Sequence, residues 1–242
     1  MTTAQVLAAG LGVVTLAAFT HAVTGFGFAL VAVPLLSVLV GPREAVVAVV
    51  VVSLVLYLAA SARTWADVDT AVLRRLLLPS AVGMPVGLLA LLWLGERPLL
   101  ALIAVATAGS TGLVAVLRKR GVRRDVTVPA GVTSGALLTA TGMNGPPLVL
   151  ACQALDLPPA RTRASLQAAF AVQQVVAVGL FAAGGRVTGE VGWLVVAGLP
   201  ALAAGWWLGD RVFARLRPER YATVVLVGLL GASLLSLVRA VA

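Results

Sequence analysis

Two interruptions in the hydrophobic sequence decide the fold of this chain: TGFG at residues 24–27 and TGMNGPP at residues 141–147. Both lie inside long apolar stretches, and Thr141 follows Thr24 at an offset of 117 residues. A helix cannot simply stop inside a lipid bilayer, because its freed N–H and C=O groups find no water there. Breaks are tolerated where they line a cavity, and paired breaks in two halves of a chain point to the binding site of a transporter.

The composition is that of an integral membrane protein. Of the 242 residues, 60% are hydrophobic and 11% are charged, and the mean hydropathy is +1.05; a soluble domain carries about 25% charged residues. Most of the apolar runs are close to the ~20 residues that span a bilayer, and they cover residues 4–40, 45–62, 76–94, 98–117, 126–155, 164–183, 191–209 and 221–238. The N-terminal residues carry no basic segment, so we expect the first run to belong to the mature protein.

The basic residues predict how the broken runs cross the membrane. Eight simple crossings would divide the 18 basic residues 10 to 8 between the two sides, with almost no bias. If each broken run instead enters and leaves on the same side, 14 of them share one side, in loops 63–75, 118–124, 156–163 and 210–220. This division fits the excess of Lys and Arg in cytoplasmic loops. It favours re-entrant hairpins at the breaks, with a kinked spanning helix as the alternative.

The predicted fold is an all-α integral membrane protein with eight membrane segments. It is a single transmembrane transporter domain over residues 1–242, made of repeat 1 (4–117), a basic loop (118–125) and repeat 2 (126–242). Each repeat has about four helical segments, one of them a broken or re-entrant Gly- and Pro-rich helix. A re-entrant hairpin does not cross the membrane, so a hairpin plus three spans makes three crossings. Because three is odd, we expect the repeats to be inverted relative to each other.

Several function classes are disfavoured by the residues present. The chain has one His and one Cys, no His/Cys/Asp/Glu cluster with metal-ligand spacing, and acidic residues only in loops or at the ends of runs. We therefore predict no enzyme activity, no cofactor and no metal. The net charge of +9 does not indicate nucleic-acid binding, because the basic residues lie in short loops between apolar runs. We expect the basic run at 118–124 to contact anionic membrane lipid.

Neutral polar groups at the breaks form the candidate site. Backbone N–H groups at Gly-rich turns and helix N-termini bind anions, and hydroxyl and amide groups complete such a site. The candidate substrate-binding residues are His21, Thr24, Gly25, Gly27, Thr141, Gly142, Asn144, Gly145 and Gln167.

Each candidate also has a structural alternative. The glycines can serve close packing, and His21 can bond a backbone carbonyl. Asn144 can tolerate a left-handed backbone, and Gln167 can join two helices. Three arginines flank the hairpins, either as ligands of an oxyanion or, more commonly, as helix-end anchors: Arg43, Arg161 and Arg163.

The glycine-rich segments that lead to prolines resemble the TauE/SafE family of sulfite exporters and anion permeases. The matching segments are residues 25–34 and 142–147, and the resemblance covers essentially the whole chain. The first segment departs from the family's glycine run at Phe26 and Phe28, and the second at Met143 and Asn144.

The resemblance implies transport of sulfite, or of small organosulfur anions such as sulfonates or sulfoacetate, across a bacterial cytoplasmic membrane. We expect a mechanism of alternating access. A carrier for another small solute and a non-transporting membrane scaffold remain alternative hypotheses. The direction of transport, the coupling ion and the oligomeric state are left open.

Overall fold

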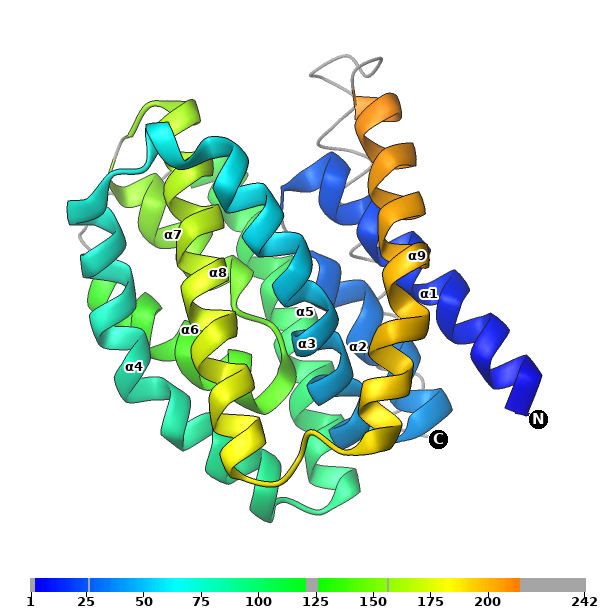
Figure 1. Ribbon diagram of the computed structural model, residues 1–242. Coiled ribbons are helices and arrows are strands. Elements are labelled where there is room, and N and C mark those ends of the chain that lie inside the picture. The colour runs from blue at the N-terminus through cyan, green and yellow to red at the C-terminus, as the bar shows by residue number, and fades with distance from the viewer. Residues whose placement is uncertain (1–2, 26, 121–125, 156, 214–242) are drawn as a thin grey trace.

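The computed structural model describes residues 3–25, 27–120, 126–155 and 157–213, and every element in them is a helix (Figure 1). In chain order the elements are α1 (Thr3–Thr24), α2 (Phe28–Val40), α3 (Pro42–Thr64), the 3-10 helix η1 (Trp65–Asp67), α4 (Thr70–Trp93), α5 (Glu96–Arg120), α6 (Thr127–Thr141), α7 (Gly145–Ala154), α8 (Pro159–Ala183) and α9 (Gly189–Phe213). The last apolar run, residues 221–238, lies outside the described residues.

Length and composition set two groups of helices apart, and α5, with 25 residues, belongs to neither. Five helices of the described residues are long and apolar enough to cross a membrane: α1, α3, α4, α8 and α9. In contrast, α2, α6 and α7 have 13, 15 and 10 residues, fewer than the ~20 that a crossing needs. The short helices are those that follow or flank the two breaks. The prediction of an all-helical membrane protein is confirmed.

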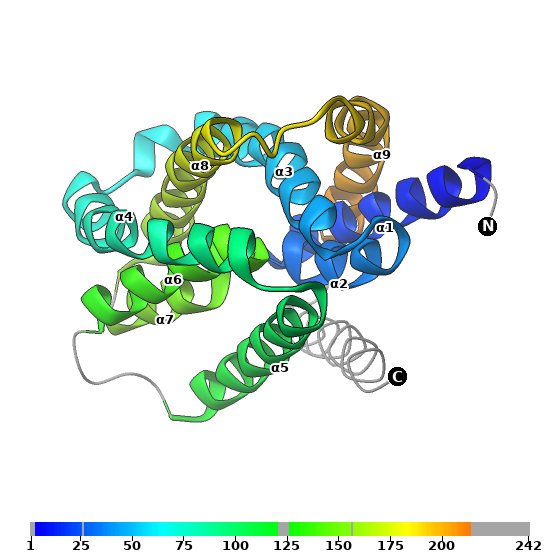
Figure 2. The ribbon, with the colours of Figure 1, turned by 90° about the horizontal axis from the view of Figure 1, so that it is seen from below.

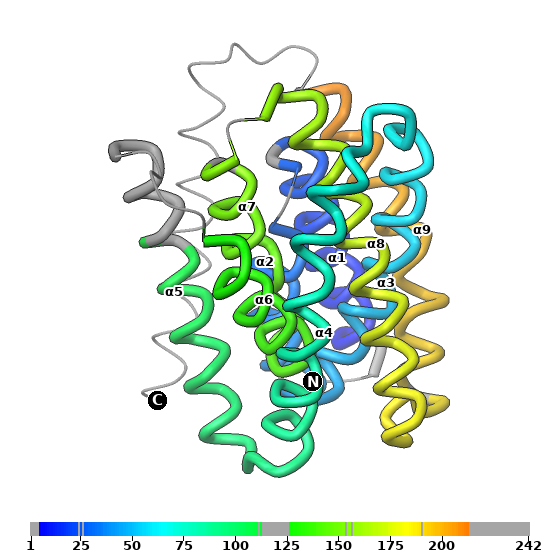
Figure 3. The backbone as a smooth tube through the Cα atoms, turned by 90° about the vertical axis from the view of Figure 1, so that its left-hand side faces the viewer, coloured from blue at the N-terminus to red at the C-terminus, as the bar shows by residue number. Residues whose placement is uncertain are grey.

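At each break the chain turns back on itself. Helix α2 packs along α1, and α7 packs along α6; Figure 3 shows α6 and α7 side by side. Both helices that follow a hairpin, α3 and α8, begin with a proline, Pro42 and Pro159. Proline suits the first turn of a helix because the N–H group that it lacks would have no partner there.

The principal contacts join the two halves of the chain. Seen from below in Figure 2, α4 of the first half lies against α6 and α8 of the second. Likewise, α9 of the second half lies against α1 and α3 of the first, and α3 packs against α8. The elements that flank both breaks are therefore held by helices of the opposite half.

Glycines allow these helices to pack backbone against backbone. A Cβ atom added to Gly83 or Gly87 of α4 would overlap the carbonyl oxygen of Val132 or Ala136 in α6. A Cβ atom on Gly205 of α9 would overlap a carbonyl oxygen of α1 in the same way. Small residues permit this close approach where helices pack in lipid.

Tryptophans mark both ends of the helix bundle. Trp93, at the end of α4, and Trp193, near the start of α9, are 78% and 77% exposed. At the other end, the Arg63 guanidinium lies 5.1 Å from the centre of the Trp206 ring. Trp at both membrane–water interfaces is typical of membrane proteins, and this distribution fits helices that cross the bilayer from one level to the other.

Candidate functional site

The two breaks have the same backbone geometry. Gly25 has φ +78° and Gly142 has φ +75°. The N–H group of Gly25 donates to the His21 carbonyl at 2.7 Å, and that of Gly142 donates to the Leu138 carbonyl at 2.8 Å. A left-handed glycine of this kind ends a helix without the steric cost that a Cβ atom would bring. Each helix therefore stops at its glycine by the same local mechanism.

The two breaks differ in the residue that caps the next helix. Gly27, the N-cap of α2, has φ +103°, whereas Asn144, the N-cap of α7, has φ −97°. Gly145 is the first residue of α7. The hypothesis that Asn144 serves to tolerate a left-handed backbone is therefore wrong, because Gly142 takes that role.

The breaks lie close together in space. A Cβ atom built on Gly142 would lie 3.2 Å from Cγ2 of Val33 and 3.7 Å from Cβ of Ala29, both in α2. The second break therefore packs on the first two turns of the helix that follows the first break.

Three glutamines of α8 connect the breaks to the rest of the bundle. Gln167 donates from Nε2 to the carbonyl oxygen of Gly25 at 3.1 Å. Gln173 accepts from Nδ2 of Asn144 at 2.7 Å. Gln174 donates from Nε2 to Oγ of Ser53 in α3 at 2.8 Å. Their exposed fractions are 3%, 0% and 1%, so the apolar helix α8 carries buried amide side chains to both breaks.

The polar groups at the second break form a closed network. Asn144 donates to Oε1 of Gln173, and Nε2 of Gln173 donates to Oγ of Ser134 at 3.3 Å. Ser134 in turn donates to the carbonyl oxygen of Asn144 at 3.0 Å. All three side chains are buried, and each bond uses a donor with a fitting acceptor. This network fixes the start of α7 against α6 and α8.

The polar groups at the first break are less completely paired. His21 is 3% exposed, and its ring meets that of Tyr57 edge-on, with the ring centres 5.2 Å apart. Within the described part of the chain, Nδ1 of His21 and Oε1 of Gln167 are buried and have no hydrogen-bond partner. Such atoms are stabilised when a ligand or water pairs with them.

The remaining predicted residues take more local roles. The Thr141 hydroxyl donates to the carbonyl of Leu137, in its own helix, at 2.8 Å. Thr24 ends α1, and its side chain lies outside the described residues.

Sequence reasoning missed Ser53 and Tyr57 of α3. Their spacing of four residues in an otherwise apolar helix, which places both on one face, is the signal that could have found them.

Arg43 has a structural partner. Its guanidinium donates to the carbonyl oxygens of Leu91, Leu92 and Leu94, at the end of α4. A cation at this position stabilises the negative end of the helix dipole. Arg161 and Arg163 are exposed. Of the three flanking arginines, Arg43 is thus a helix-end anchor.

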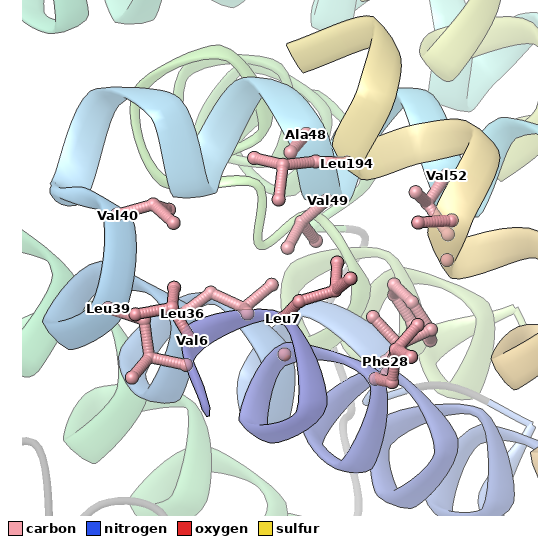
Figure 4. A pocket seen from close by; sticks show the side chains of 15 residues that line it. Val6, Leu7, Phe28, Leu36, Leu39, Val40, Ala48, Val49, Val52 and Leu194 are labelled. Atoms are coloured by element: carbon pink, nitrogen blue, oxygen red, sulfur yellow. The ribbon is translucent and has the colours of Figure 1, made fainter. Parts of the chain in front are cut away.

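A small cavity lies between α1, α2, α3 and α9 (Figure 4). Its volume is about 30 Å³, and its lining is apolar, including Phe28, Leu36, Val49 and Leu194. An apolar cavity offers nothing to balance an anionic charge. The candidate anion site is therefore the polar cluster at the breaks and not this cavity.

A bundle of apolar helices with two paired helix breaks is typical of membrane transport proteins. The family model described as "Sulfite exporter TauE/SafE" matches residues 10–237, nearly the whole chain. The chain belongs to this family, which confirms the resemblance seen in its sequence. Comparison with curated proteins and with solved structures found no match. Among the described residues, no group of His, Cys, Asp and Glu is placed to hold a metal ion.

Proposed function

We propose that this protein exports small sulfur-containing oxyanions, of the sulfite, sulfonate or sulfoacetate type, across a bacterial cytoplasmic membrane by alternating access. The observation that carries the proposal is the matched geometry of the two breaks, the second of which packs on α2, in a chain from a sulfite exporter family. Paired helix breaks of this kind are where secondary transporters bind their substrates.

The contacts between α3 and α8 support the inverted repeats over residues 4–117 and 126–242. The offset of 117 residues relates Ser53 to Phe170 and Tyr57 to Gln174. The bond between Gln174 and Ser53 thus has a counterpart in the ring contact between Tyr57 and Phe170, whose centres are 5.0 Å apart. Each contact becomes the other when the halves are exchanged, as a two-fold axis between α3 and α8 requires.

The direction of the two helices supports inversion as well. Ser53 of α3 contacts Gln174, and Tyr57, one turn later, contacts Phe170, one turn earlier in α8. Beyond α3 and η1, the N–H group of Asp69 donates to Oγ of Ser165, still nearer the start of α8, at 3.1 Å. Contacts that advance along α3 therefore retreat along α8, and the two helices are antiparallel. Equivalent helices that run in opposite directions belong to repeats of opposite orientation in the membrane.

The site chemistry supports an anion rather than a cation as the substrate. Among the described residues, the buried polar side chains are hydroxyls and amides together with His21, and none is a carboxylate. Hard cations prefer charged oxygen ligands, whereas an anion is held by the N–H groups and positive end of a helix N-terminus. The start of α2 supplies both at the first break.

The proposal is tested by transport in proteoliposomes. Labelled sulfite, sulfate and methanesulfonate are supplied to the wild type, to Asn144→Ala and to Thr70→Ala, an exposed control in the first turn of α4. We expect flux of a sulfur oxyanion in the wild type and control, and a several-fold lower maximal rate in folded Asn144→Ala, because α7 loses its bond to Gln173. Absence of flux of every anion in the wild type, under gradients of either direction, would refute the export function.

A further inference from the structure

The two breaks are unequal in the donors that they can offer. At the second break the side chains bond to one another, and Pro146 and Pro147, in the first turn of α7, carry no N–H group. A break whose side chains are paired and whose helix has two residues without an N–H group in its first turn offers fewer donors to an anion.

The first break has the opposite character. The first N–H groups of a helix have no acceptor within the helix, and in α2 the ladder begins with Val31, which donates to Gly27 at 3.3 Å. The residues before it, Phe28, Ala29 and Leu30, are buried and keep their N–H groups, since none is proline. Helix α2 thus directs donors and its positive end toward the break.

Gln167 adds an acceptor at the same place. Its Nε2 bonds the carbonyl oxygen of Gly25, which can only accept, so the orientation of the amide is fixed. Oε1 of Gln167 is therefore the atom left over, and it is buried and without a partner among the described residues. An unpaired buried acceptor disfavours a ligand whose polar atoms are all acceptors, and it favours one that can donate a hydrogen bond.

Gln174 repeats this arrangement two turns along the same face of α8. Ser53 donates its proton to the carbonyl of Val50 at 3.2 Å, so its oxygen receives the Nε2 group of Gln174. Oε1 of Gln174 also has no partner in the described part of the chain. The buried face of α8 that carries Gln167 and Gln174 is therefore an acceptor surface.

We infer that the substrate head binds at the first break, between the start of α2 and Gln167, and that it is an oxyanion which itself carries a hydrogen-bond donor. The singly protonated form of sulfite has this chemistry: its oxygens accept from the N–H groups of α2, and its proton is donated to Oε1 of Gln167. The second break holds the hairpin in place. This inference rests on the proposed export function and narrows its substrate.

The geometry makes Gln167 a specificity-determining residue. Methanesulfonate has three similar oxygens and one charge but no donor, so it leaves Oε1 of Gln167 unpaired. A site built to hydrogen-bond a substrate hydroxyl rejects an analogue without it, and we expect discrimination of about tenfold or more. A doubly charged oxyanion is disfavoured for a second reason, because no cationic side chain is among the buried polar residues described here.

The test compares Gln167→Met with Gln173→Met, a matched change six residues along α8. Full-length protein in proteoliposomes is assayed for labelled sulfite uptake at mildly acidic pH, with unlabelled methanesulfonate as the competitor. We expect Gln167→Met to raise the KM for sulfite about fivefold or more and to weaken the preference over methanesulfonate. Gln173→Met should lower the maximal rate or the thermal stability and keep the KM and the preference of the wild type.

A measurement on the wild type stands beside the variants, in case Gln167→Met does not fold. When the KM is measured at several pH values, the KM expressed as protonated sulfite should stay constant. A KM that is constant only when expressed as the doubly charged anion would overturn the inference, as would an unchanged KM in folded Gln167→Met. Sulfite flux that requires Na⁺ in the wild type and no longer requires it in Gln167→Met would also overturn the inference. Wild-type protein that moves no anion refutes the export function itself.

Discussion

The side-chain amide of Gln167 donates a 3.1 Å hydrogen bond to the carbonyl oxygen of Gly25, across 142 residues of sequence. This bond links α8, in the second half of the chain, to the break that follows α1, in the first half. Any rocking of one half against the other must preserve or exchange it. This hydrogen bond therefore couples the packing of α8 to the geometry of the candidate site at the first break.

The first prediction concerns the left-handed glycines. Alanine at Gly25 or Gly142 should destabilise the protein by about 1–2 kcal/mol, because an L-residue is strained at positive φ. The loss should be larger at Gly142, where the new methyl group would also lie 3.2 Å from Val33. Thermal unfolding in detergent measures both. Gly12→Ala, at an open helical position, should be neutral or stabilising; equal melting temperatures for all three variants would refute the prediction.

A second prediction concerns the crossing of α4 and α6. Gly83→Ala should reduce stability by about 1–3 kcal/mol, the usual cost of overpacking, because its methyl group would overlap the carbonyl of Val132. Gly205→Ala should behave alike at the crossing of α9 and α1. The yield of monodisperse protein and the melting temperature report the loss. The control is Gly179→Ala in α8, where nothing lies near the added atom, and a comparable loss in this control would contradict the explanation.

The third prediction separates the anchoring role of Arg43 from substrate binding. Arg43→Ala removes the donors at the end of α4 and should cost about 1–2 kcal/mol of stability. The KM for sulfite should remain that of the wild type, since the guanidinium is engaged with backbone carbonyls. Melting temperature and uptake kinetics are measured on the same preparation. A raised KM with unchanged stability would instead make Arg43 a ligand of the anion.

The fourth prediction tests the inverted topology. Single cysteines are introduced, in a Cys152→Ser background, at Val68 and at the exposed Ala160 in the first turn of α8, both predicted on the basic side, and at Gly95 and Val187 in two loops on the other side. A membrane-impermeant thiol reagent applied to intact cells should label Gly95→Cys and Val187→Cys, and should label the other two only after permeabilisation. This pattern follows from the excess of basic residues in cytoplasmic loops. Labelling of Ala160→Cys on the same side as Gly95→Cys, with Val187→Cys on the side of Val68→Cys, would show that α6 and α7 do not form a re-entrant hairpin.

The sequence by itself determined the membrane class, the two break positions and the family. These follow from local properties: apolar runs near the length that spans a bilayer, and glycines where the chain must leave the helix. The prediction that helices stop near Thr24 and Thr141 agrees with α1 and α6. The sequence also marked His21, Asn144 and Gln167 as polar groups in apolar surroundings, but the composition of a run cannot tell which of them remain unpaired.

Tertiary structure decided which polar atoms find partners. Gln173 sits beside Gln174 in sequence, yet the first faces Asn144 and the second faces Ser53, because consecutive helical residues point about 100° apart. The packing of α8 against α3 and α4 of the first half and α6 and α7 of its own half leaves Oε1 of Gln167 unpaired and closes the network around Asn144. Hydrogen bonding is satisfied only by atoms within reach in space, so the difference between two similar-looking breaks arises from the fold and not from the motif.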